Sequence, residues 1–148
     1  MAEPRPARPD EAATLRALVR AAYAVYVPRL GREPAPMTDD YAVRIAAGQA
    51  WILEEDGTPV GALILEDQPD GLLLYNIAVA PAAQGQGVGR RLLAFTEAEA
   101  RRRGYGLLRL YTNEKMVENV AMYPRRGFTE THRGAEAGHR RVHFEKRL

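Results

Sequence analysis

The chain has 148 residues and no cysteine, and 21 Lys and Arg against 19 Asp and Glu give a net charge of +2. The missing cysteine excludes disulfides, thiolate metal sites and a cysteine nucleophile, and no apolar run approaches the ~20 residues that span a bilayer. The length predicts one domain over residues 1–148. The N-terminus lacks the apolar stretch of a signal peptide, so we expect a cytoplasmic protein.

The first half of the chain predicts two helices followed by three strands. After an extended segment over residues 4–8, Asp10 is expected to cap a helix that reaches Tyr26. A loop rich in Pro and Gly covers residues 28–36. Thr38 is expected to cap a short helix that ends near Gly48. Strands are predicted at residues 51–53, 60–65 and 72–79, and the first two surround a hairpin turn at Asp56-Gly57.

The second half predicts two further helices and three strands. The first helix covers residues 92–100 and ends at three arginines followed by Gly104, an arrangement typical of helix C-termini. A strand at 107–112, a helix at 116–125 and strands at 128–131 and 142–146 follow. The predicted order is therefore β-α-α-β-β-β-α-β-α-β-β.

Three glycines at alternate positions, Gly85, Gly87 and Gly89, lie between an apolar strand and a helix. Glycine lets a ligand approach the backbone closely, and N–H groups at a helix N-terminus bind anions such as pyrophosphate. The P-loop pattern fails because Arg90 and Arg91 stand where it needs Lys and Ser or Thr, and the G-x-G-x-x-G dinucleotide pattern fails too. The alternative is a helix-entry loop shaped only for packing.

Two motifs carry a family resemblance. Gln84-x-x-Gly87-x-Gly89, after Ile77-Ala78-Val79, resembles motif A of the GCN5-related N-acetyltransferases, the GNAT family. Asn119 to Tyr123, followed by Gly127-Phe128, resembles that family's motif B. The resemblance implies an α/β (α+β) fold, with a GNAT-like mixed, mostly antiparallel central sheet of 6–7 strands and about four flanking helices. It also implies an acetyl-CoA-dependent N-acetyltransferase, with acetyl-CoA as cosubstrate and no metal.

The resemblance assigns cofactor contacts to two segments. Pyrophosphate is expected on the glycine segment and pantetheine on the preceding strand, where the N–H of Ile77 or Val79 would polarise the thioester carbonyl. Arg91 can add positive charge or belong to a solvated helix face. The expected cofactor-binding residues are Ile77, Ala78, Val79, Gln84, Gly85, Gly87, Val88, Gly89, Arg90 and Asn119.

Tyr123 is the expected catalytic residue, because the resemblance places its hydroxyl where it can protonate the departing CoA thiolate. Attack by an amine also needs a base. Some relatives carry a glutamate on the strand before the glycine segment, but this chain has Leu74-Tyr75-Asn76 there. Glu114 and Glu118 are candidates, and neither is assigned. For Asn113, a helix cap before Met116 is favoured over an amide contact to pantetheine.

Two other functions stay open beside acetyl transfer. One is a non-catalytic acyl-CoA-binding or regulatory module of the same fold. The other is nucleic-acid binding, since residues 75–148 hold 14 basic and 7 acidic side chains. The run Arg101–Arg103 is better explained by the dipole of its own helix, so we expect no nucleic-acid and no membrane partner.

The expected acceptor is a primary amine, in the first place a small molecule, and the resemblance makes a homodimer an expectation. Tyr23 and Tyr26, with nearby acidic residues, are candidates for attracting a cationic amine. His139 and His143 have a spacing seen in zinc sites on helices. On a strand they share a face, and we expect surface or interface histidines there rather than metal ligands.

Overall fold

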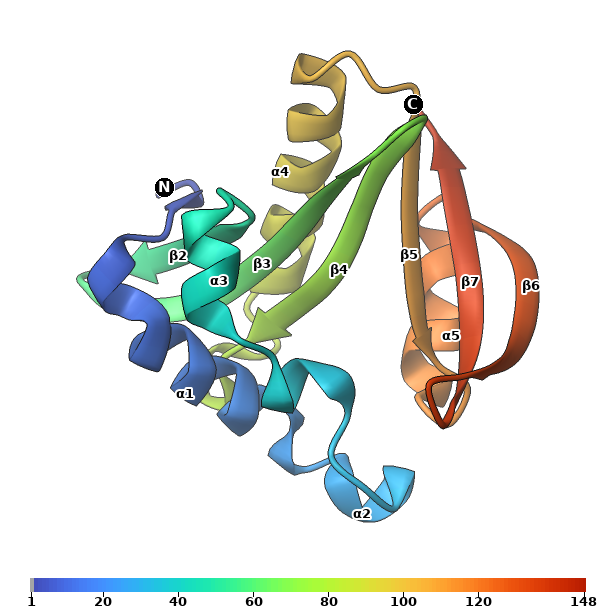
Figure 1. Cartoon of the computed structure of the whole chain (residues 1–148), viewed down its shortest axis with the longest axis horizontal. Helices are drawn as coiled ribbons and strands as arrows, with labels where there is room; N and C mark the ends of the chain where they lie inside the picture. The colour runs from blue at the N-terminus through green and yellow to red at the C-terminus, as the bar shows by residue number, and fades with distance from the viewer. Residues whose placement is uncertain (1) are drawn as a thin grey trace. The chain divides into compact units, whose positions relative to one another are not determined.

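The computed structural model describes residues 2–148 and has the expected mixed α/β fold (Figure 1). Its seven strands form one sheet in the order β1-β2-β3-β4-β5-β7-β6. The sheet is mostly antiparallel, with β4 and β5 parallel over Leu72–Leu74 and Leu108–Leu110. The strands are β1 (Arg5–Pro6), β2 (Ala50–Glu55), β3 (Thr58–Gln68), β4 (Gly71–Val79), β5 (Leu107–Asn113), β6 (Thr129–Glu136) and β7 (His139–Arg147).

Five α-helices and three 3-10 turns connect these strands within the described residues. The helices are α1 (Ala12–Ala24), α2 (Val27–Leu30), α3 (Tyr41–Ala46), α4 (Val88–Arg102) and α5 (Val117–Arg125). The 3-10 turns are η1 (Pro9–Glu11), η2 (Ala35–Thr38) and η3 (Pro81–Ala83). The predicted order is confirmed except for α2, which is an additional helix.

The chain forms two compact units. The first contains the described residues up to Leu65 together with Asn76–Thr96, and the second contains Glu66–Tyr75 and Glu97–Leu148. The strands β3 and β4 and the helix α4 therefore contribute to both units. The expected single domain over residues 1–148 stays a prediction.

In the first unit, helices cover both faces of the sheet. Figure 1 shows α1 and α3 in front of β2 and β3, with the start of α4 behind them. A Cβ atom at Gly61 of β3 would lie 2.9 Å from Leu92 Cδ1 and 3.1 Å from Val88 Cγ1 of α4. Glycine at this position therefore lets α4 pack closely on the sheet.

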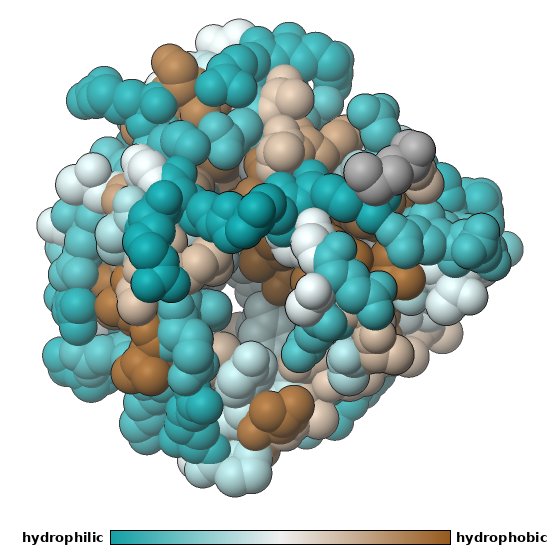
Figure 2. Space-filling view, turned by 180° about the vertical axis from the view of Figure 1, so that it is seen from behind, coloured by the Kyte–Doolittle hydropathy of each residue, from teal (hydrophilic) through white to brown (hydrophobic). Residues whose placement is uncertain are grey.

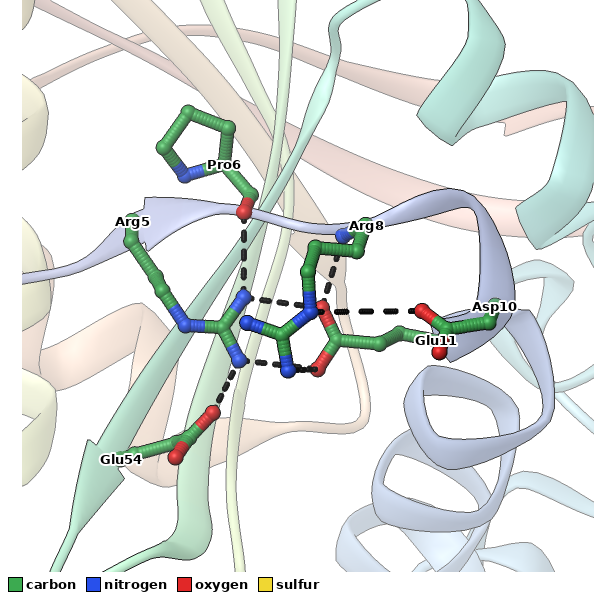
Figure 3. A network of polar contacts seen from close by, with 6 residues as sticks. All are labelled: Arg5, Pro6, Arg8, Asp10, Glu11 and Glu54. Atoms are coloured by element: carbon green, nitrogen blue, oxygen red, sulfur yellow. Dashed lines mark hydrogen bonds and ion pairs between the residues drawn. The ribbon is translucent and has the colours of Figure 1, made fainter.

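The N-terminal segment of the first unit is held by a charged network (Figure 3). The guanidinium of Arg5 donates to both carboxylate oxygens of Glu11 at 2.8 Å and also pairs with Glu54 of β2. The backbone N–H of Arg8 donates to Glu11 Oε1 at 2.7 Å. These contacts join β1, β2 and the start of α1, and they hold the pKa of Glu11 at about 2, chiefly through the hydrogen bond from Arg5.

In the second unit, β7 lies between β5 and β6, and its alternate residues face opposite sides. Val142 and Phe144 are buried, whereas Arg141 and His143 are only half-buried. Tyr123 of α5 packs on Phe144, with ring centroids 5.7 Å apart. The helix α5 therefore covers the Phe144 side of these strands.

Three local predictions differ from the structure for identifiable reasons. Asp10 does not cap α1, because Pro9–Glu11 form a 3-10 turn and the helix begins after it. Asp40, and not Thr38, caps α3 by accepting a hydrogen bond from the Val43 N–H at 3.2 Å. The α2 segment was expected to be loop, but Pro28 occupies its first turn and Gly31, with φ of 80°, ends it. Proline is common in the first turn of a helix, and glycine is common just after its end.

The face of the molecule opposite to the view of Figure 1 is largely hydrophilic. Figure 2 shows hydrophilic side chains over most of that face, and apolar residues form separate patches between them. Within residues 2–148, no helix is long and apolar enough to cross a membrane.

Candidate active site

The glycine segment follows β4 in the first unit and leads into α4. Gly85 and Gly87 have φ of 79° and 80°, a conformation that L side chains rarely adopt. A Cβ atom at either position would meet no heavy atom of the described residues within 4 Å. The backbone therefore requires glycine at both positions, while the space beside them is open.

Gly89 differs from these two glycines because its φ is not positive. A Cβ atom there would meet only Val79 Cγ2, at an ordinary contact distance of 3.8 Å. Packing inside the protein therefore does not require glycine at position 89. Backbone conformation alone accounts for Gly85 and Gly87, with or without a ligand, whereas neither conformation nor packing accounts for Gly89.

The N-terminus of α4 offers hydrogen-bond donors beside this open space. The N–H groups of Val88, Gly89 and Arg90 lie in its first turn, where no intrahelical acceptor is available. Oriented N–H groups and the helix dipole together favour an anion. The segment can therefore bind a phosphate or pyrophosphate group through its main chain.

Arg90 and Arg91 have different surroundings. The Arg91 guanidinium pairs with Glu55 and donates to the Ala2 carbonyl at 2.7 Å. Arg90 is exposed, and the structure gives it no ion pair with any acidic residue in the described part of the chain. Arg91 thus has structural partners, and Arg90 is the arginine available to an anion.

The end of β4 lies against the same segment. Ala78 is buried, whereas Ile77 and Val79 are half-buried. The Gln84 amide donates to the Val79 carbonyl at 3.4 Å, which turns this side chain back toward the strand. The structure therefore brings Val79, Gln84 and Gly89 together.

Asn76, one residue before this stretch, is the centre of a buried polar chain that the sequence did not reveal. Its Oδ1 accepts from the Tyr23 hydroxyl at 2.9 Å, and its Nδ2 donates to the Tyr41 hydroxyl at 3.2 Å. The Tyr41 hydroxyl in turn donates to the Pro36 carbonyl at 2.5 Å. These partners lie 35 and 53 residues away in sequence, so only the fold could show the contact. A polar residue in an apolar strand was the one signal available.

Tyr123, the expected catalytic residue, lies in α5 of the second unit. Its side chain is 4% exposed and packs on Phe128 and Phe144, with ring centroids 5.5 and 5.7 Å away. Burial raises the pKa of Tyr123 to about 12. Its hydroxyl has no hydrogen-bond partner among residues 2–148. The phenol is therefore protonated at neutral pH, the form that a general acid needs.

Asn119 lies one turn before Tyr123 on α5. Its amide donates to Thr112 Oγ1 of β5 at 3.3 Å, which fixes the orientation of the side chain. Asn113 Oδ1 accepts from the Lys115 N–H at 2.9 Å, and the Met116 N–H donates to its carbonyl. Asn113 therefore shapes the turn before α5 and does not cap the helix as the sequence favoured, because the N-cap position is Met116.

Of the two base candidates, Glu114 does not have the surroundings of a free base. Glu114 accepts from Arg140 at 2.8 Å and pairs with Arg133 at 3.6 Å. The hydrogen bond from Arg140 lowers its pKa, and so makes it a weaker proton acceptor. Glu118 is exposed at the start of α5. No base is assigned.

The run Arg101–Arg103 has structural partners at the end of α4. Arg102 and Arg103 both donate to Glu99, at 2.5 and 2.7 Å, and Arg103 also pairs with Asp67 at 3.0 Å. These contacts agree with a basic helix end that stabilises its own helix.

The chain is similar to known acetyltransferases in sequence and in fold. The family model of the acetyltransferase (GNAT) domain matches residues 46–130, which include the glycine segment and most of the second unit through α5. The chain is 35% identical over 83 residues to a mycothiol acetyltransferase of Jonesia denitrificans, covering 55% of this chain and 26% of that protein. It is 37% identical over 59 residues to an aminoalkylphosphonate N-acetyltransferase of Salmonella typhimurium, covering 40% of this chain and 38% of that protein. The chain thus spans about a quarter to two fifths of the length of these curated relatives.

Among solved structures, the chain is similar to the PaiA N-acetyltransferase of Thermoplasma acidophilum in complex with coenzyme A. The TM-score is 0.82 at 16% identity, over 100% of this chain and 99% of that one. At this identity the likeness shows the fold. Because the family model matches more than half of the chain and includes both sequence motifs, the chain belongs to the GNAT acetyltransferase domain family.

Proposed function

We propose that residues 1–148 act as one acetyl-CoA-dependent N-acetyltransferase domain that acetylates a primary amine. The observation that carries this proposal is the open space beside Gly85 and Gly87 at the start of α4. The main chain there offers N–H donors to a pyrophosphate group, and Arg90 adds a positive charge that no described acidic residue neutralises. Family membership and the coenzyme A complex of the similar structure support the choice of ligand.

The residues of this chain fit acetyl-CoA by the chemistry of their donors. Gly85, Gly87, Val88, Gly89 and Arg90 would hold the pyrophosphate through backbone N–H groups, with Gln84 beside them. Ile77, Ala78 and Val79 would lie along the pantetheine arm, and Asn119 would bind one of its amides. Bound acetyl-CoA supplies an activated acetyl group as a thioester.

Tyr123 would donate a proton as the acetyl group leaves sulfur. The amine nitrogen forms a bond to the acetyl carbon, the carbon–sulfur bond breaks, and the thiolate takes the proton of the Tyr123 hydroxyl. The amine loses one proton to a base or to water. Burial keeps the Tyr123 phenol protonated at neutral pH, the form that a general acid needs, and its pKa of about 12 makes it a weaker acid than an ordinary tyrosine.

One observation favours the second candidate, a non-catalytic acyl-CoA-binding module. The β4 stretch where some relatives carry a glutamate is Leu74-Tyr75-Asn76, which holds no carboxylate, and the Asn76 amide already binds two tyrosine hydroxyls. Glu114 is paired with two arginines. Such a module would bind acetyl-CoA and release no CoA thiol.

Two of the relatives support a small-molecule acceptor by analogy. The aminoalkylphosphonate and mycothiol enzymes are named for small molecules, and this supports a small-molecule amine. The Tyr23–Met37 region contains Tyr23, Tyr26 and one acidic residue, Glu33, which already pairs with Arg20 at 2.8 Å, so the aromatic rings are the groups left there to attract a cationic amine.

Three measurements test the proposal. Calorimetry should detect acetyl-CoA binding, and saturating acetyl-CoA should raise the melting temperature, because a ligand at about 100 times its Kd stabilises a fold by roughly 2.7 kcal/mol. CoA thiol release is then followed with a panel of primary amines. Binding with no release for any amine would favour the non-catalytic module, and absence of binding would reject both candidates.

A further inference from the structure

The hairpin of β6 and β7 in the second unit brings together three side chains that ligate metals. His132 and Glu136 lie on β6 and His143 lies on β7, and their nearest ligand atoms are all within 4.8 Å of one another. Sequence spacing had drawn attention to His139 and His143 instead. His132 is directly opposite His143 in the strand pairing, so the sheet register creates this cluster.

We propose that His132, Glu136 and His143 form a Zn²⁺ site. Two imidazoles and one carboxylate are a donor set that zinc uses, with water at the fourth position. Ligand atoms on one tetrahedral Zn²⁺ are about 3.3 Å apart, given bonds of about 2.0–2.1 Å. The cluster would therefore close by at most about 1.5 Å, which side-chain rotation on a partly exposed hairpin can supply.

The hydrogen bonds of His132 leave the correct nitrogen available. The Thr131 hydroxyl donates to the His143 carbonyl at 3.4 Å and also lies 3.0 Å from His132 Nδ1. When the single hydroxyl hydrogen is used in the contact to the carbonyl, Nδ1 is the donor in the second contact. In this tautomer the neutral ring carries its lone pair on Nε2, where a metal can bind.

His143 and Glu136 are already in contact. His143 Nε2 lies 2.6 Å from Glu136 Oε1, and Zn²⁺ would replace the proton that they share. The His143 ring is stacked between His132 and Tyr111, with centroids 4.1 and 5.3 Å away. A metal binds in the plane of an imidazole, so the His132 ring, which lies at 12° to the His143 ring, has to turn out of this stack when both rings bind one Zn²⁺, and its exposed position allows that rotation.

Two neighbours support the position of the Glu136 carboxylate. Gly134 lies between His132 and Glu136 on the same face of β6, and a Cβ there would meet nothing within 4 Å in the described chain. Glu136 can therefore extend over Gly134 toward His143. Its second oxygen, Oε2, is 3.7 Å from the Arg141 guanidinium, which leaves Oε1 for the metal.

This inference does not depend on the proposed acetyl transfer. Bound Zn²⁺ would link β6 to β7 and stabilise the hairpin by mass action. The chain has three histidines and no cysteine, so His139 is the one histidine outside the cluster and provides a matched control on the same hairpin.

The test is a titration of the full chain with Zn²⁺ in competition with a chromogenic chelator. The variants are His132→Asn, Glu136→Gln, His143→Asn and His139→Asn, each checked by circular dichroism. Loss of an outer-shell partner alone weakens metal affinity about 10–100-fold, so each of the first three changes should weaken binding at least tenfold. His139→Asn should bind like the unchanged chain. Exposed His132 and half-buried Glu136 provide the decisive variants if His143→Asn fails to fold.

Substitution of Co²⁺ gives a second readout, because bound Co²⁺ shows d–d absorption that reports its ligands. We expect the d–d absorption of bound Co²⁺ in the unchanged chain and in His139→Asn, and we expect it to be lost in His132→Asn. A Zn²⁺ affinity that is the same in all four variants, or no binding of one equivalent to the unchanged chain, would overturn the proposal.

Discussion

The guanidinium of Arg91 pairs with the carboxylate of Glu55, whereas its sequence neighbour Arg90 has no acidic partner among the described residues. The two arginines occupy adjacent positions at the start of α4, and so they form a matched pair for experiment. One is committed to the fold, and the other is available to a ligand.

Arg90→Ala is expected to weaken acetyl-CoA binding about tenfold, because a charge-assisted contact to phosphate is lost. The melting temperature should not change. Arg91→Ala should instead lower the melting temperature slightly and leave affinity closer to that of the unchanged chain. Calorimetry at two salt concentrations checks this, since the Arg90 contribution should shrink as salt is added. Equal losses of affinity in both variants would contradict the distinction.

Gly89→Ala is expected to raise stability and lower cofactor affinity. The new methyl group meets only Val79 at 3.8 Å, and alanine is better than glycine in a helix by up to about 1 kcal/mol. The same methyl group would occupy the approach of the pyrophosphate. Urea unfolding and calorimetry measure the two effects separately.

Gly106→Ala is the control for this change, because a Cβ atom there would meet nothing within 4 Å in the described chain and the residue lies outside the glycine segment. It should leave acetyl-CoA affinity unchanged. If Gly89→Ala binds acetyl-CoA as tightly as Gly106→Ala, the pyrophosphate does not approach the helix at this residue.

Local sequence patterns predicted most helices and strands. The features that the sequence could not show are contacts between residues that lie far apart in the chain. The Asp56-Gly57 turn was predictable because both residues must take positive φ, and they do, at 51° and 77°. Pro28 and Gly31 led to the prediction of a loop, because proline and glycine are common in loops. The same residue types also stand at the start and the end of short helices, and that is their role in α2. The glycine segment could be identified from its spacing. The Asn76 chain could not, since its partners come from α1 and α3.

Asn76→Ala is expected to lower the free energy of unfolding by about 1–3 kcal/mol. Removing the amide takes away the partner that joins the Tyr23 and Tyr41 hydroxyls inside the first unit. Asn113→Ala is the control, because its side chain makes one local contact to the Lys115 N–H. Urea unfolding should show a clearly smaller loss for the control. A loss at Asn76 no larger than at Asn113 would mean that the buried chain adds little stability.

The stability of the protein should fall as pH decreases from about 4.5 to about 2, in part because of Glu11. The pKa of Glu11 is lowered to about 2, so its ionised form stabilises the folded state above the unfolded pKa. That contribution is lost as the pH falls through the pKa of Glu11 in the folded state, which is about 2. Glu11→Gln should therefore be less stable at pH 7, and the difference from the unchanged chain should shrink toward pH 2. Urea unfolding at pH 7, 4 and 3 checks this. A difference that does not vary with pH would show that Glu11 acts through packing.

Tyr123→Phe should separate catalysis from packing. The change keeps the ring contacts with Phe128 and Phe144, and the hydroxyl has no hydrogen-bond partner among residues 2–148, so the melting temperature should stay the same. If the phenol protonates the leaving thiolate, kcat should fall while acetyl-CoA affinity changes little. General-acid catalysis contributes about 10²–10⁴-fold, and we expect the lower end because a thiolate leaves fairly well without a proton. With a pKa of about 12, Tyr123 should cause no decline in kcat between pH 6 and 9.

Steady-state kinetics with an active amine measure kcat of Tyr123→Phe, and calorimetry measures its affinity for acetyl-CoA. A normal kcat would reject the acid role, and a loss of affinity at unchanged kcat would show that Tyr123 binds the pantetheine arm instead.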